Sequence, residues 1–125
     1  MGYALVFLGG GIGAALRHGV NRSSLAVLGP FFPFGTMIVN VAGSLAMGFL
    51  ATLFLMKGGS SSQSLRLFLT TGILGGFTTF SAFSLDAALL WEKAEWWSLA
   101  VYVIGSVVVS IAALFGGMAL ARALL

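Results

Sequence analysis

The sequence predicts an all-α integral membrane protein with four transmembrane helices, and three observations support this fold class. Hydrophobic residues make up 59% of the 125 residues and charged residues only 7%, whereas a soluble domain carries about 25% charged residues. The mean hydropathy is +1.09. Four apolar stretches, separated by short polar links, are each long enough to cross about 30 Å of hydrocarbon. We expect a single transmembrane domain over residues 1–125 in a lipid bilayer.

The expected helices follow from where the apolar stretches begin and end. The first covers residues 3–20, the second 35–56, the third 67–85 with a continuation to 91, and the fourth 96–121. The link at 21–35 contains both prolines and should break any helix, and the link at 57–64 is a glycine/serine tract. In the last link Trp91, Trp96 and Trp97 flank charged residues, which is typical of an interfacial aromatic belt.

The basic residues that normally orient a membrane protein are balanced between the two sides. With four spans, one side receives Lys57, Arg66 and Arg122 together with the N-terminus, and the other receives Arg17, Arg22 and Lys93. A chain without such a bias has no strong reason to insert one way, so insertion in both orientations is one expectation. The alternative is that Arg17 lies within the membrane and does not count, which leaves a weak bias.

Several classes of function are disfavoured by composition and motifs. The net charge of +3 comes from residues too sparse and scattered for a nucleic-acid footprint, so we expect no nucleic-acid partner. Without cysteine there is neither a disulfide framework nor a thiolate metal site. The glycines at 9 and 11 with Ala14 match a loose dinucleotide fingerprint, but no alternating strands and helices follow. His18, Ser81 and Asp86 lack a nucleophile-elbow pattern. We therefore expect no enzyme.

Polar side chains at membrane depth are costly unless they serve structure or transport. Arg17 either snorkels from the end of the first helix to the interface or forms a positive site that draws anions. Asn40 either bridges two helices or donates its amide N–H to an anion. Tyr102, Ser106 and Ser110 recur every four residues, so they line one helix face as a hydroxyl track or as a packing stripe.

Pairs of small residues at a spacing of four favour close helix contacts, either between subunits or within one subunit. The pairs are Gly9 and Gly13, Gly72 and Gly76, and Ser106 and Ser110. Because glycine is abundant in this chain, we favour packing within one subunit for any single pair.

The segment GGFTTFSAFSLD at 75–86 is unusual inside an apolar span. Gly75 and Gly76 permit a break in the helix, and a broken helix frees backbone carbonyls that a cation can bind. Beyond the break, Phe80 and Phe83 lie on one face, and the positive edge of a phenyl ring attracts anions. Because no acidic residue precedes Asp86 in the motif, the pattern favours a dehydrated anion as the permeating species. The alternative is an ordinary aromatic core.

Together these residues resemble the Fluc or CrcB family of small fluoride channels. The resemblance spans nearly the whole chain and is carried by GGGIGAALR at 9–17, GTMIVNVAGS at 35–44, TTGILGGFTTFSAFS at 70–84, and the spacing of Tyr102, Ser106 and Ser110. It implies an antiparallel dual-topology homodimer in the inner membrane of a bacterial cell, with two fluoride pores. It also implies a central structural sodium ion (Na+) and passive export of fluoride, which reduces its toxicity in the cytoplasm.

The resemblance also implies roles for particular residues. The residues that match the family's fluoride pore are Asn40, Phe80, Phe83, Tyr102, Ser106 and Ser110. Arg17 matches a basic residue of the pore vestibule, and the backbone carbonyls of Gly75 and Thr78 match the Na+ ligands. The sequence departs from the family pattern at Ala82, where threonine or serine is frequent, and at Asp86, where glutamate is common.

Two other functions compete with a fluoride channel. A small multidrug exporter also has four short helices, but its proton exchange needs an acid within the membrane, and Asp86 is the only candidate here. A non-transporting assembly subunit would explain the pairs of small residues but not the phenylalanine and hydroxyl pattern.

Overall fold

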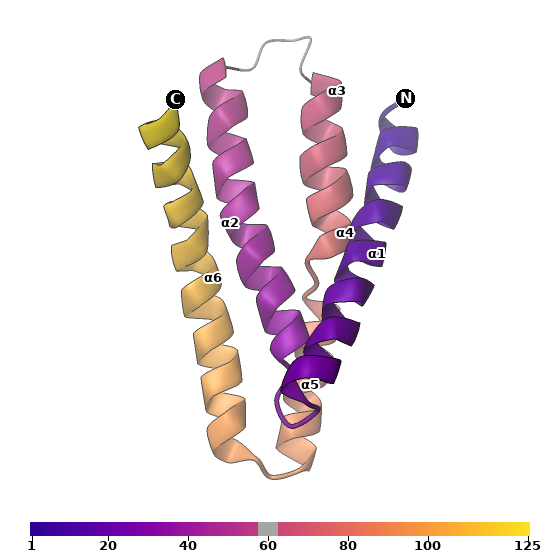
Figure 1. The fold of residues 1–125 in the computed structure, drawn as a ribbon, viewed down its shortest axis with the longest axis vertical. Coiled ribbons are helices and arrows are strands. Elements are labelled where there is room, and N and C mark those ends of the chain that lie inside the picture. Colours follow the sequence, from indigo (N-terminus) through magenta and orange to yellow (C-terminus); the bar gives the residue numbers. More distant parts are fainter. Residues whose placement is uncertain (58–62) are drawn as a thin grey trace.

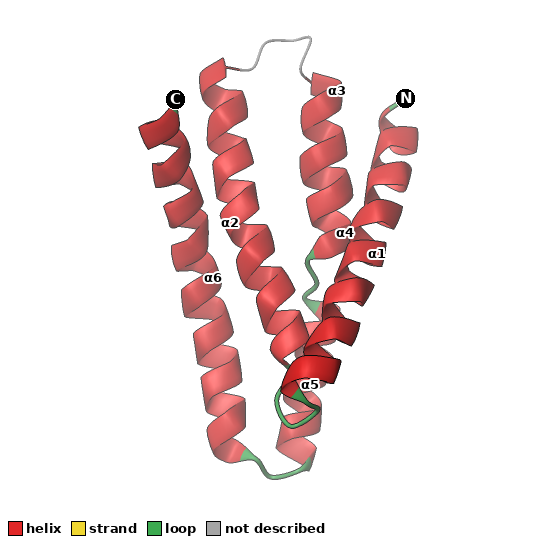
Figure 2. Ribbon diagram, in the orientation of Figure 1, coloured by secondary structure: helices red, strands yellow, loops and turns green. Residues whose placement is uncertain are grey.

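The computed structural model describes residues 1–57 and 63–125, and regular structure within these ranges is entirely helical (Figure 2). The elements in chain order are α1 (Gly2–Leu28), α2 (Phe34–Lys57), α3 (Gln63–Arg66), the π-helix η2 (Leu67–Leu74), α4 (Gly75–Phe77), α5 (Ser81–Glu92) and α6 (Trp96–Leu124). The elements from α3 to α5 together make up the span Gln63–Glu92, which we call the third helix. The all-α prediction is confirmed for the described residues.

Three of the described helical segments are long and apolar enough to cross a membrane: Phe34–Lys57, Gln63–Glu92 and Trp96–Leu124. The chain is therefore a multi-pass membrane protein. Helix α1 is 27 residues long but is not among these described spans, because Arg17, His18 and several glycines lower its hydropathy. The expectation of four spans is confirmed for three, and a crossing by α1 remains a prediction.

The helices pack as two close pairs that run lengthwise through the bundle (Figure 1). Helix α2 lies along α6, and α1 lies along η2 and α4. Both chain termini lie at one end of the bundle, together with the end of α2, and the link between α5 and α6 lies at the opposite end. Lys57 and Lys93 therefore lie at opposite ends of the bundle.

The contact between α1 and the third helix depends on glycine on both sides. A Cβ atom on Gly9 would come within 2.9 Å of the Cα atom of Gly72, and one on Gly13 would overlap the carbonyl of Ile73. A Cβ on Gly76 would likewise overlap the backbone of α1. These two glycine pairs pack helices within one chain, as expected for them.

The first link differs from its prediction. Helix α1 does not end at Val20 but continues to Leu28, because residues 21–28 contain neither glycine nor proline. It ends at Gly29, whose φ of 82° few other residues adopt. Both prolines lie after this helix end, at positions 30 and 33. The link is therefore confined to residues 29–33, and the prolines lie inside it. In the second link, residues 58–62 of the predicted glycine/serine tract lie outside the described residues.

Candidate functional site

The third helix is broken at residues 78–80, which confirms the predicted break but moves it away from the glycines. Gly75 has helical dihedral angles (φ −62°, ψ −37°), whereas Thr78 is extended (φ −87°, ψ 158°). The interpretation that Gly75 and Gly76 open the helix was therefore wrong. Gly76 instead allows the close approach of α1, and the chain leaves the helix only at the first threonine.

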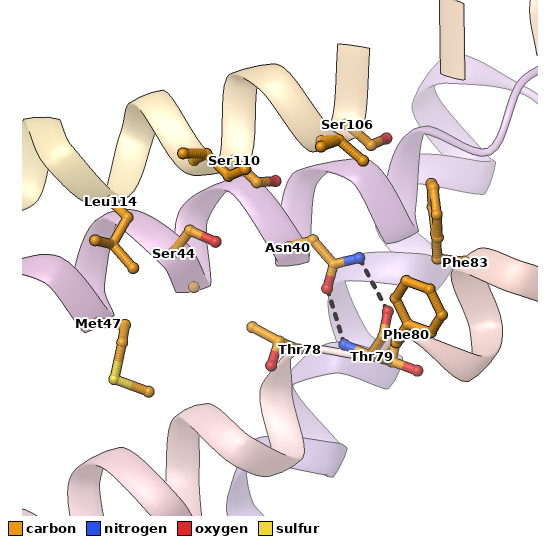
Figure 3. Close-up of a pocket in the computed structure, with 13 residues that line it drawn as sticks. Asn40, Ser44, Met47, Thr78, Thr79, Phe80, Phe83, Ser106, Ser110 and Leu114 are labelled. Carbon is orange, nitrogen blue, oxygen red and sulfur yellow. Dashed lines mark hydrogen bonds between the residues drawn. The ribbon is translucent and has the colours of Figure 1, made fainter. Parts of the chain in front are cut away.

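A side chain of α2 holds the broken segment in place. The Asn40 Nδ2 donates to the carbonyl of Thr79 at 3.0 Å, and the Thr79 N–H donates to Asn40 Oδ1 at 2.8 Å (Figure 3). The Thr79 hydroxyl then accepts the N–H of Ala82 at 3.1 Å, which satisfies a free amide at the start of α5. Asn40 thus bridges two helices, and one of its two amide hydrogens is used in doing so.

These hydrogen bonds redirect two donors away from the carbonyls that a continuous helix would give them. In such a helix the Thr79 N–H would bond the carbonyl of Gly75, and the Ala82 N–H would bond that of Thr78. Both N–H groups bond side chains instead. The two released carbonyls, those of Gly75 and Thr78, are the pair that the family resemblance implies as Na+ ligands. Within the described residues, His, Asp and Glu form no cluster of three that could hold a metal.

A groove with a volume of about 380 Å³ lies between the break, α2 and α6 (Figure 3). It is lined by Asn40, Gly43, Ser44, Met47, Thr78, Thr79, Phe80, Phe83, Ser106, Val107, Ser110, Ile111 and Leu114. None of these described residues is charged. The groove therefore offers hydroxyl and amide groups against an apolar wall.

Two hydroxyls in this groove differ from the others near the break. Thr78 donates its hydroxyl to the carbonyl four residues earlier, and Ser84 does the same, which is the usual way for such groups to be satisfied in a helix. Ser106 and Ser110 also lie in a helix, yet within the described part of the chain their buried hydroxyls have no hydrogen-bond partner. Both side chains line the groove.

The two predicted pore phenylalanines lie side by side but differ in exposure. Their ring centroids are 5.6 Å apart with an interplanar angle of 47°. Phe83 is buried, with 8% of its surface exposed, whereas Phe80 is 77% exposed in the single chain. Both rings line the groove. The Phe83 ring forms part of the buried wall of the groove, and the Phe80 ring projects from the surface of the chain.

Tyr102 lies behind this wall. It is fully buried, packs against Phe83 at 5.1 Å between ring centroids, and donates its hydroxyl to Asp86 Oδ2 at 2.9 Å. The lining described for the groove does not include it. The structure therefore brings Ser106 and Ser110 into the groove together and directs the Tyr102 hydroxyl to a carboxylate.

Arg17 lies one helical turn beyond Gly13, and therefore on the face of α1 that meets the third helix. Its side chain is half-buried, and its Nε atom is buried without a partner among the described residues. It does not line the groove as described.

The sequence analysis did not single out Ser44 or Thr79, which both line the groove. Ser44 follows Asn40 by four residues, so helical periodicity could have placed it on the same face. Thr79 lies inside the motif, but its pairing with Asn40 depends on residues 39 positions apart, and no local pattern reveals such a contact.

The described residues thus define a multi-pass membrane protein with a polar, uncharged groove between α2, α6 and the broken third helix. Comparison with known proteins identifies the family. The chain belongs to the CrcB-like protein family, Camphor Resistance (CrcB), which it matches over residues 4–118. The resemblance found in the sequence is thereby confirmed.

The chain is closely similar to several curated bacterial proteins. It is 60% identical over 124 residues, 99% of both chains, to the fluoride-specific ion channel FluC of Rhodopseudomonas palustris strain BisB5. It is 54% identical over 122 residues, 98% of both, to fluoride-specific ion channel FluC 2 of Nitrobacter hamburgensis. It is 57% identical over 118 residues, 94% of both, to FluC of Methylobacterium nodulans. The family is one of ion channels, so the expectation that the chain is not an enzyme is confirmed.

Proposed function

We propose that this chain is a fluoride-selective channel that lets fluoride leave the cell passively across the inner membrane and so reduces its toxicity in the cytoplasm. The relatives named as fluoride-specific channels support the identity of the ion. The structural observation that carries the proposal is the pair of unpartnered hydroxyls of Ser106 and Ser110 in the groove. A small anion that loses its water needs such donors in exchange.

The surroundings of the groove favour an anion over a cation. Its described lining contains no acidic side chain. Helix α5 begins at Ser81 beside the groove, so the positive end of its dipole lies near the bound ion. The rings of Phe80 and Phe83 present edges that carry partial positive charge. A cation would meet none of the carboxylates that usually hold it in a membrane.

The proposed pore residues contribute in different ways. Ser106 and Ser110 donate hydroxyls, and the remaining amide hydrogen of Asn40 adds a third donor. Phe80 and Phe83 supply ring edges. Of the residues suggested by the family resemblance, Tyr102 supports the wall from behind, and Arg17 attracts the anion into a vestibule from its place on α1.

We also propose that the active form is an antiparallel dual-topology homodimer. Phe80 is 77% exposed beside the open groove, and a second chain would cover it and close the pore. The balanced basic residues support insertion in both orientations, which supplies the two antiparallel partners. A two-fold axis makes both subunits present the same surface, and hence gives two pores.

A structural Na+ fits the carbonyls of Gly75 and Thr78. Carbonyl oxygens are suitable ligands for a hard cation, and the redirected N–H groups of Thr79 and Ala82 leave these two available. One chain offers a pair, and an antiparallel partner would offer the same pair again. Bound there, the positive ion would attract the carbonyl oxygens of both chains and so hold their two broken helices together.

Ion flux from purified protein in liposomes tests the proposed function. We expect fluoride efflux that needs no proton partner and does not occur with chloride. The double variant Ser106→Ala with Ser110→Ala should slow efflux strongly, whereas Ser23→Ala, on an exposed part of α1, should not. Exchange of protons for organic cations would instead identify a multidrug exporter, and absence of any flux would favour an assembly subunit.

A further inference from the structure

A second cavity, of about 350 Å³, shares no lining residue with the groove. Its lining comes from the end of α1, the link at 29–33, the start of α2 and one face of α5. Ala82 and Asp86, one helical turn apart, line this cavity, whereas Phe83 lines the groove. One face of α5 therefore borders the groove, and another face borders the second cavity.

Phe83, which lines the groove, packs against Tyr102 behind it. They are 8% and 0% exposed, and their ring centroids are 5.1 Å apart. Phe32, from the link before α2, meets the Tyr102 ring edge-on at 5.6 Å and 90°. The orientation of the Phe83 ring toward the groove therefore depends on where Tyr102 lies.

The position of Tyr102 is in turn set by polar contacts of its hydroxyl, with Asp86 and with the side chain of Thr36. Its buried hydroxyl donates to Asp86 Oδ2 at 2.9 Å, and a hydrogen bond to a charged acceptor contributes more than a neutral one. Without this acceptor the buried phenol would keep only the neutral Thr36 hydroxyl as a partner, and the ring would be held less firmly. Asp86 itself faces the second cavity and not the groove.

We propose that Asp86 is a positioning residue for the ion pathway: by accepting the Tyr102 hydroxyl it holds the tyrosine ring against Phe83 and so sets the ring that borders the groove. This inference rests on the proposed function. In this role the Asp86 carboxylate acts through Tyr102 and does not contact the permeating anion. Direct contact would be unfavourable, because the negative carboxylate would repel the anion.

A double-mutant cycle on fluoride efflux tests whether Asp86 acts through Tyr102. Asp86→Ala and Tyr102→Phe should each slow efflux roughly tenfold, the scale of one charge-assisted hydrogen bond. The double variant should be no slower than the slower single variant. Asp86→Glu, which keeps a carboxylate, should restore most of the rate. Multiplying effects in the double variant, or faster efflux in Asp86→Asn, would overturn the proposal and indicate a direct action of the charge on the ion.

A spectroscopic readout makes the test independent of flux. The chain has two tyrosines, and Tyr3 is 95% exposed, so Tyr3→Phe leaves Tyr102 as the sole tyrosine. Its ultraviolet resonance Raman doublet should show a phenol that donates strongly, and Asp86→Ala should abolish this signature while Asp86→Glu keeps it. An unchanged doublet in Asp86→Ala would refute the bond. If the native protein passes no fluoride, the proposed function fails, and the doublet still decides whether Asp86 holds Tyr102.

Discussion

Asn40 and Thr79 exchange two hydrogen bonds across the break in the third helix, at 3.0 and 2.8 Å. The side-chain amide of Asn40 thereby takes the place of a backbone partner for a residue that has left its helix. Because Asn40 belongs to α2, the break is held by a neighbouring helix and not by its own glycines. The position of the groove beside the break follows from this contact.

We expect Asn40→Leu to destabilise the protein, because it leaves both the N–H and the carbonyl of Thr79 without a partner at membrane depth. Each unpaired group should lower the free energy of unfolding by about 1–3 kcal/mol. Chemical unfolding in detergent, followed by circular dichroism, measures the loss. The matched control is Gln63→Leu, since Gln63 is exposed and should tolerate the change. Equal stability of the two variants would show that the Asn40 contact is not needed.

The sequence was sufficient to predict the all-helical fold, because apolar stretches of this length have few alternatives in a bilayer. It also predicted the break in the third helix, but for the wrong reason. Gly75 and Gly76 lower helix propensity, yet in the structure both remain helical. The position of the break depends instead on contacts with other helices. Close packing of α1 requires Gly76, and the hydrogen bond to Asn40 holds Thr79 outside the helix.

The candidate site was predictable only where helical periodicity applies. The spacing of Ser106 and Ser110 placed both on one face of α6, and both line the groove. The same spacing placed Tyr102 on that face, but its long side chain reaches Asp86 instead. Periodicity gives the direction of the Cα–Cβ bond and not the partner of a distant hydroxyl.

Glycine at position 13 should be essential for packing, whereas glycine at position 11 should not. A methyl group on Gly13 would overlap the backbone of Ile73, and one on Gly11 would meet nothing within 4 Å. We expect Gly13→Ala to lower the free energy of unfolding by about 1–3 kcal/mol. Gly11→Ala should raise it by up to about 1 kcal/mol through helix propensity. Thermal unfolding of the two variants, compared side by side, measures both effects, and equal melting temperatures would contradict the packing argument.

The two phenylalanines should respond differently in stability but alike in transport. Isoleucine keeps apolar bulk and removes the ring edge, so both Phe80→Ile and Phe83→Ile should slow fluoride efflux by roughly tenfold or more. Phe83 is buried within one chain, so its replacement should lower the free energy of unfolding of that chain, by about 1.5 kcal/mol or less, whereas Phe80→Ile should leave the stability of the single chain unchanged.

The control for the phenylalanine variants is Phe68→Ile, which lies in η2 outside the groove and should conduct at close to the native rate. Efflux from liposomes at equal protein content measures all three variants. If both groove variants conduct normally, the ring edges do not line the ion path, and Ser106 and Ser110 must carry the ion without them.

Dual topology predicts that the orientation of the chain is decided by very few charges. Reporter fusions placed after Leu125 should be active on both sides of the membrane, because the basic residues are balanced between the two sides when Arg17 is counted with Arg22 and Lys93. Lysines inserted beside Lys93 should hold that end in the cytoplasm, and lysines inserted beside Arg122 should hold the other end there. The same insertions made with glutamine serve as the charge-free control.

Each lysine variant expressed alone should be inactive, because an antiparallel dimer needs chains of both orientations. Expressed together, the two variants should restore fluoride efflux, since each supplies the partner that the other lacks. Efflux from cells, with the reporter signal measured in the same strains, tests both statements. Full activity of one variant with a reporter signal from a single side would show that parallel chains suffice. The exposed ring of Phe80 would then need a different partner surface.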